Sequence, residues 1–156
     1  MKRQKGFSLI ELLIVVAIIL IIAAIAIPNL LKSKMAANES SAVGSIRTIN
    51  TGQVTYAAGC PNVGFSATLS ELNTGAICAS GTGIIDSVLA STQKSGYKFA
   101  YTPGTAVNSI VYTYTVNAIP ASVGTTGQRG FYSDQSGVIR YTLDGSAPTN
   151  ASNALQ

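Results

Sequence analysis

The sequence predicts an α+β fold in which one long N-terminal helix packs on an antiparallel sheet of three or four strands. Three patterns in the 156-residue chain support this prediction. An uncharged apolar block covers residues 12–27, a helical apolar stripe follows it, and the C-terminal third alternates aromatic or β-branched residues with polar ones. The stripe gives the sheet the apolar cover that it needs.

The first predicted element is an apolar helix over residues 7–27, which follows a short basic leader at residues 1–6. At 1.5 Å per residue this helix is about 31 Å long, which matches the hydrocarbon thickness of a bilayer. The leader holds Lys2, Arg3 and Lys5, so its charge is an orientation signal. Without these three, the chain has seven basic residues (ten minus three) and six acidic ones, so its charge is nearly balanced. We therefore expect no nucleic-acid site.

The helical pattern resumes after Pro28, and we expect a single helix from about Phe7 to about Ala57. Because proline lacks an N–H donor, Pro28 is expected to kink this helix rather than end it. The motif Gly59-Cys60-Pro61-Asn62 is a stop signal. The apolar stripe of the second half consists of Met35, Ala42, Val43, Ile46, Ile49 and Tyr56.

The strand predictions fall in the C-terminal third. Residues 109–119 alternate with period two and give the strongest prediction, and residues 97–102 give a second strand. Residues 130–133 and 138–143 are expected to form a hairpin through the turn at residues 134–137.

The segment between the long helix and the first strand is expected to be largely irregular. Residues 66–72 predict a short helical turn, and residues 84–90 fit either a turn or a strand. The expected divisions of the chain are a leader (1–6), a transmembrane helix (7–28), an amphipathic helix (29–58) and a globular head (59–156).

The two cysteines, Cys60 and Cys78, predict a disulfide. In an exported chain, two cysteines 18 positions apart fit a disulfide formed in an oxidising compartment. Closing that loop adds about 3 kcal/mol to the free energy of unfolding in the chain-entropy picture. Two buried thiols are the alternative. The loop between the cysteines is rich in Gly, Ser and Thr and offers little core of its own, which favours the disulfide.

Glu11 is a carboxylate near the start of the apolar helix. An ionised side chain inside a bilayer costs about 2.5–3.5 kcal/mol on insertion scales, so it indicates a function and calls for a partner. The basic residues and Gly6 just before it supply a possible cleavage point, and cleavage would create a new amine as that partner.

The run Gly6-Phe7-Ser8-Leu9-Ile10-Glu11-Leu12, the apolar block and Pro28 together resemble the N-terminus of type IV pilins and their pseudopilin relatives. The match is specific over residues 5–28 and architectural over residues 29–57. In the rest of the chain it extends to the fold alone, which is the pilin fold of a long helix on an antiparallel sheet.

The resemblance implies a role for each motif residue. A prepilin peptidase would cut between Gly6 and Phe7 and then N-methylate Phe7. The carboxylate of Glu11 would pair with the Phe7 amine of a neighbouring subunit, because opposite charges attract strongly in a low-dielectric core. The chain would reside in the bacterial inner membrane as a single-pass protein. The pilus assembly machinery would then build it into a homopolymeric surface fibre for adhesion, twitching motility or DNA uptake.

Two alternatives remain at this point. A pseudopilin of a type II secretion system, or a minor pilin, would have the same N-terminus. A secreted binding domain with an ordinary signal peptide is the other alternative, because Ala24-Ile25-Ala26 resembles a small-residue cleavage site. Glu11 and the length of the apolar block disfavour an ordinary signal peptide.

Enzymatic function has no support in the sequence. The chain has no histidine, and no phosphate-binding loop or cluster of metal ligands stands out, so we expect no cofactor and no metal. Asp134 and Asp144 lie beside glycines, but their spacing lacks the alternating oxygen ligands of a calcium loop. We therefore interpret both as turn-forming residues.

Overall fold

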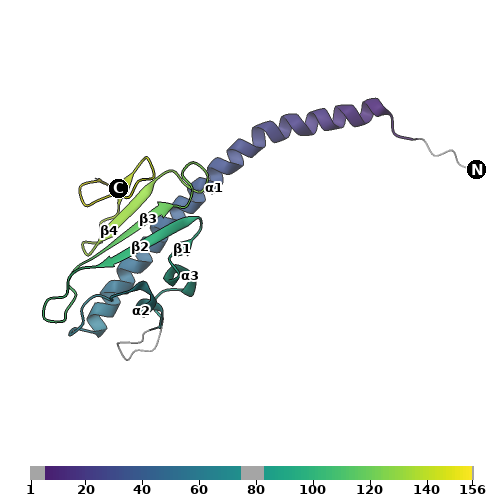
Figure 1. Cartoon of the computed structure of the whole chain (residues 1–156). Coiled ribbons are helices and arrows are strands. Elements are labelled where there is room, and N and C mark those ends of the chain that lie inside the picture. Colours follow the sequence, from purple (N-terminus) through teal and green to yellow (C-terminus); the bar gives the residue numbers. More distant parts are fainter. Residues whose placement is uncertain (1–5, 75–82, 156) are drawn as a thin grey trace, which may run out of the picture. The chain divides into compact units, whose positions relative to one another are not determined.

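The computed structural model describes residues 6–74 and 83–155 (Figure 1). The chain forms two compact units, Met1–Lys34 and Met35–Gln156. The helices are α1 (Leu9–Gly59), α2 (Leu69–Thr74) and α3 (Ser87–Ala90). The strands are β1 (Gln93–Lys94), β2 (Tyr97–Pro103), β3 (Tyr114–Pro120), β4 (Gly130–Asp134), β5 (Arg140–Thr142) and β6 (Asn153–Ala154).

Helix α1 confirms the prediction of one long helix. It contains 51 residues and continues through Pro28 without ending. Two threonines on its exposed side donate their hydroxyls to carbonyls one turn earlier: Thr48 to Gly44 at 3.0 Å and Thr55 to Thr51 at 2.9 Å.

The α+β class is confirmed, but the sheet of the described residues has six strands rather than three or four. All neighbouring strands are antiparallel, in the order β1-β2-β3-β4-β5-β6. The additional strands, β1 and β6, have two residues each, which is too short for a period-two pattern to reveal them.

The strand predicted over residues 109–119 starts later than expected, at Tyr114. Asn108 and Ser109 both have positive φ, 51° and 66°, and Val107 and Ile110 on either side exchange backbone hydrogen bonds. These features make a tight two-residue turn, which this sequence builds without the glycine that usually marks it. The first residues of the predicted strand therefore lie in a loop.

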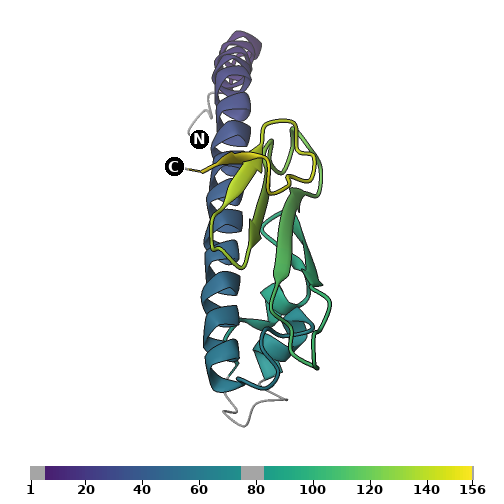
Figure 2. The ribbon, with the colours of Figure 1, turned by 90° about the vertical axis from the view of Figure 1, so that its left-hand side faces the viewer.

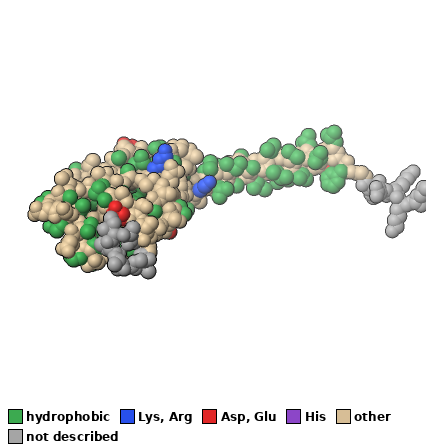
Figure 3. Space-filling view, turned by 60° about the horizontal axis from the view of Figure 1, so that its bottom comes forward, with side chains coloured by type: hydrophobic (Ala, Val, Ile, Leu, Met, Phe, Trp, Pro, Cys, Tyr) green, Lys and Arg blue, Asp and Glu red, His purple; other side chains and the backbone are tan. Residues whose placement is uncertain are grey.

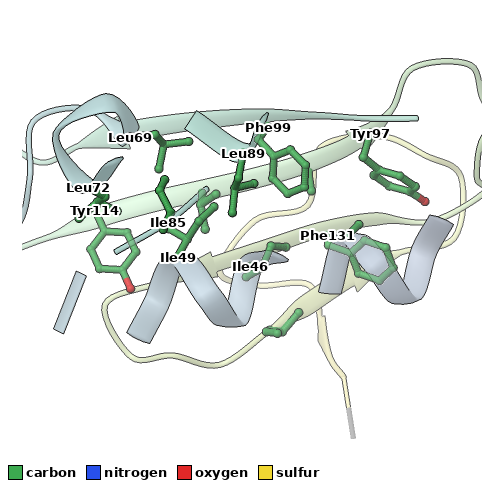
Figure 4. Close-up of a cluster of buried hydrophobic side chains, with 14 of the residues drawn as sticks. Ile46, Ile49, Leu69, Leu72, Ile85, Leu89, Tyr97, Phe99, Tyr114 and Phe131 are labelled. Carbon is green, nitrogen blue, oxygen red and sulfur yellow. The ribbon is translucent and has the colours of Figure 1, made fainter. Parts of the chain in front are cut away.

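In the second unit, the C-terminal part of α1 runs along one face of the sheet (Figure 2). Strand β3 alternates buried and half-buried residues, so one of its faces is directed at the core. Ile46 and Ile49 of α1 are fully buried there (Figure 4). The large sheet side chains of this core are Tyr97, Phe99, Tyr114 and Phe131.

Polar side chains also cross from α1 into the core. The Gln53 amide donates to the Ser66 hydroxyl at 2.7 Å, and the Ser66 N–H donates back to Gln53 at 3.0 Å. One turn away, the Asn50 amide donates to the Ser133 hydroxyl at 2.8 Å and accepts from the Tyr114 hydroxyl at 3.0 Å. The apolar stripe did not predict these contacts.

The short elements agree with the sequence in part. Helix α2 overlaps the turn predicted at residues 66–72. The alternatives for residues 84–90 resolve as a helical turn, α3, in which the N-cap residue Asp86 accepts a hydrogen bond from the N–H of Leu89. Asp134 and Asp144 each accept from the N–H and hydroxyl of the serine two residues on, which agrees with their interpretation as turn-forming residues.

Candidate assembly site at the start of the long helix

The predicted cleavage point lies just before the helix. Gly6 and Phe7 precede the first helical residue, Leu9, and both are exposed. The Phe7 side chain is 82% exposed, and a Cβ placed on Gly6 would have no atom within 4 Å. The peptide bond between them is therefore exposed and outside the helix.

Ser8 and Glu11 form a capping box at the start of α1. The Glu11 carboxylate accepts a hydrogen bond from the Ser8 N–H at 2.9 Å, and the Ser8 hydroxyl accepts one from the N–H of Ile10 at 3.3 Å. This reciprocal arrangement satisfies N–H groups that the first turn of a helix leaves without partners. It also places a negative charge at the positive end of the helix dipole.

The importance of Glu11 was predicted from the sequence, but its hydrogen bond with Ser8 was not. The signal was present, because Ser-x-x-Glu ahead of an apolar run is the sequence signature of a capping box. Among the residues that the structure describes, Ser8 alone bonds to this carboxylate. One carboxylate oxygen therefore still has room for a second donor.

The helix beyond Glu11 exposes a continuous apolar surface (Figure 3). From Leu12 to Ile27 no side chain is charged and the large ones are about half exposed or more. Within the described residues, α1 is the one helix long and apolar enough to cross a membrane, judged by length and composition, and none of its most apolar stretch is buried. A surface of this kind in a folded chain needs either lipid or another protein to cover it.

The comparisons with known proteins give one family model, which matches this segment, and several relatives. This family model, described as the prokaryotic N-terminal methylation motif, matches residues 1–27. The chain is also 48% identical over 54 residues to the type IV major pilin protein PilA of Myxococcus xanthus, which covers 35% of this chain and 24% of that protein.

Two further relatives are also similar to this chain over a short stretch. The type IV wide pilus major component PilA4 of Thermus thermophilus is 60% identical over 40 residues (26% of this chain and 30% of that protein). The type II secretion system core protein G of Dickeya chrysanthemi is 38% identical over 45 residues (29% of each). The matches thus span less than a third of each relative's length. No solved structure matches the chain. The resemblance to type IV pilins is confirmed.

The remaining predicted site residues stand as follows. Pro28 lies inside α1, and a kink there stays a prediction. Cys60 is buried at the end of the helix and is not a free thiol. Cys78 lies outside the described residues, so the disulfide between them also stays a prediction.

Proposed function

We propose that this protein is a structural subunit that polymerises into a type IV pilus, and that it works by assembly rather than by catalysis. The observation that carries the proposal is Glu11, whose carboxylate caps the first turn of an exposed apolar helix within an N-terminal methylation motif. Adhesion, twitching motility and DNA uptake all remain compatible with such a fibre.

Maturation would begin at Gly6. A prepilin peptidase would cut the accessible bond between Gly6 and Phe7 and transfer a methyl group to the new amine of Phe7. Methylation keeps that amine cationic, so the mature chain would start with a positive charge four residues before Glu11. The capping box would survive the cut, because both of its members lie beyond Phe7.

Assembly would then bring the Phe7 amine of one subunit to the Glu11 carboxylate of another. In a core with little water each of these charges is costly alone, whereas the pair offsets most of that cost. Because the pairing requires a defined axial position, it would set the register of neighbouring helices. The capping box holds the carboxylate in place until the amine arrives.

The apolar surface from Leu12 to Ile27 would be used twice. In the bacterial inner membrane it would contact lipid as a single-pass helix, and in the fibre it would contact other copies of the chain. The subunit would thus leave the bilayer without exposing this surface to water. The pilus assembly machinery would drive that transfer to the cell surface.

A pseudopilin of a type II secretion system is the second candidate, and the match to the core protein G of such a system favours it. A minor pilin has the same N-terminal requirements. Electron microscopy of sheared surface material, with the subunit identified by mass spectrometry, separates these functions. Abundant long fibres made of this chain indicate a major pilin.

The central experiment replaces Glu11 with Ala and with Gln. We expect both variants to be cut after Gly6, as shown by the mass of a chain that begins with N-methylated Phe7, but to yield at least tenfold fewer fibres. Wild-type fibre yield in Glu11→Ala would refute the pairing role. A chain that instead begins near Ile27 would show an ordinary signal peptide and refute the whole proposal.

A further inference from the structure

The attachment of α1 to the sheet changes character along its length. From Ile46 onward, α1 is attached by apolar packing, because Ile46, Ile49 and Tyr56 are buried in the core. Before Ile46, its buried side chains are Glu39, Ala42 and Ser45. These three offer little apolar area, so hydrophobic burial holds this end of the interface weakly.

Hydrogen bonds replace burial at that end. The Asn38 amide donates to the Thr126 carbonyl at 2.8 Å. Glu39 then accepts from the N–H groups of Gln128 and Arg129, at 2.9 and 3.1 Å, and from the Arg129 side chain at 2.8 Å. All these partners lie in the loop between β3 and β4, so two adjacent residues of α1 hold the whole loop.

The carboxylate of this arrangement is buried, whereas the Arg129 side chain that it pairs with is 37% exposed. Glu39 is 8% exposed, and the guanidinium of its partner, Arg129, lies over the rings of Phe131 and Tyr141 at 5.5 and 5.9 Å. The Tyr97 hydroxyl donates to the Arg129 carbonyl at 2.8 Å, which ties the same loop to β2. A carboxylate so placed is costly to bury unless all its bonds form together.

We propose that Asn38 and Glu39 act as a latch that fastens the head (residues 59–156) to α1. When the helix is pulled, the interface between α1 and the head opens first at this latch. The source of the pull rests on the proposed function, since a polymer would load each subunit through α1. The latch itself is a property of the single chain and can be tested without fibres. Once its hydrogen bonds break, the contacts that resist separation before Ile46 are the buried Ala42, the partly buried Val43 and one exposed hydrogen bond from the Ser41 hydroxyl to the Ser95 hydroxyl.

The test measures local opening in the full chain in detergent micelles by the reactivity of buried thiols. Ala42→Cys places a thiol one turn after the latch, and Val116→Cys places one in the middle of β3, both at positions at most 1% exposed. On adding Glu39→Ala, we expect labelling at position 42 to accelerate at least tenfold and labelling at position 116 to change less than threefold. Amide exchange at Gln128 and Arg129 should accelerate together with position 42.

The matched control is Lys94→Ala, which removes the other ion pair of the described residues, Lys94–Asp86 at 2.8 Å, without touching α1. It should leave labelling at both positions unchanged. Equal acceleration at positions 42 and 116 would show that Glu39 supports global stability, and no acceleration at position 42 would show that it fastens nothing; either result overturns the latch. Should Glu39→Ala not fold, Glu39→Gln keeps an oxygen for the N–H groups of Gln128 and Arg129 but removes the ion pair and the hydrogen bond from the Arg129 side chain, and we expect at least threefold acceleration at position 42.

Discussion

Gln53 and Ser66 hold each other through two hydrogen bonds in the core, although 13 residues separate them and neither carries a charge. Both side chains are fully buried. The Ser66 carbonyl also accepts from the Tyr101 hydroxyl at 2.6 Å. The pair therefore joins α1, the chain that follows it, and β2 into one polar network inside an apolar core.

Replacing Gln53 with Ala should lower the free energy of unfolding by about 1–3 kcal/mol, because the buried Ser66 N–H loses its acceptor. The matched control is Thr51→Ala, an exposed polar position on the same helix, which should change stability by about 0.5 kcal/mol or less. Thermal unfolding of the full chain in detergent, followed by circular dichroism, measures both. Equal effects would mean that the network adds nothing.

Glu39 should make stability fall in acid. Burial raises the pKa of its carboxyl, but hydrogen bonds from Gln128 and Arg129 outweigh burial and hold the pKa below its ordinary 4.5. A depressed pKa in the folded state adds stability that is complete above the unfolded pKa and is lost as the pH falls through the folded one. Wild type should therefore exceed Glu39→Gln in melting temperature at pH 7.

That difference in melting temperature should begin to shrink below about pH 4.5, where the unfolded chain takes up the proton, and it should be lost once the pH falls below the lowered pKa of the folded state, where both proteins carry a neutral side chain at position 39. The pKa values of Asp86, Asp134 and Asp144 are lowered too, each by hydrogen bonds to its carboxylate, so only the difference between the two proteins isolates Glu39. A difference that stays constant from pH 7 to pH 3 would contradict the assignment.

Ser8→Ala should weaken the start of α1 without removing Glu11. The Ile10 N–H loses its acceptor, and loss of such a cap costs about 0.5–2 kcal/mol of local helix stability. We expect faster amide exchange in the first turn and a fibre yield between that of wild type and that of Glu11→Ala. Ser8→Thr keeps the hydroxyl and should behave as wild type. Wild-type yield in Ser8→Ala would show that the cap has no part in assembly.

Gly64 and Gly124 separate backbone strain from steric overlap. Their φ values are 77° and 78°, but a Cβ at Gly64 would overlap the Val111 carbonyl oxygen, whereas at Gly124 nothing lies within 4 Å. Gly124→Ala should cost about 1 kcal/mol, from the left-handed conformation alone. Gly64→Ala should cost about 2 kcal/mol more, because the backbone must also move. Denaturant unfolding of the two variants tests this order.

The sequence predicts α1 well because its evidence is long and redundant. A long apolar block predicts the first half, and six residues on one helical face predict the second, so Pro28 between them does not change the result. The strands are less secure, since β1 and β6 are too short to show a pattern. The predicted start of β3, at residue 109, is wrong because Asn108 and Ser109 adopt left-handed conformations that nothing in their residue types requires.

The two charged sites differ in the same way. The capping box of Ser8 and Glu11 lies within four consecutive residues, so it can be identified from the sequence alone. Glu39 bonds to residues 89 and 90 positions away. Only the fold brings these partners together, and no local pattern distinguishes Glu39 from an ordinary solvated charge.

The threonines on the outer side of α1 have one more consequence. Because Thr48 and Thr55 already donate to carbonyls of their own helix, their hydroxyl protons do not depend on the solvent. A neighbour that displaces the water around these two hydroxyls leaves neither donor unpaired, so covering this pair of threonines has almost no cost in hydrogen bonding. Thr48 and Thr55 are polar, but a neighbouring surface can cover both without leaving an unpaired hydroxyl donor.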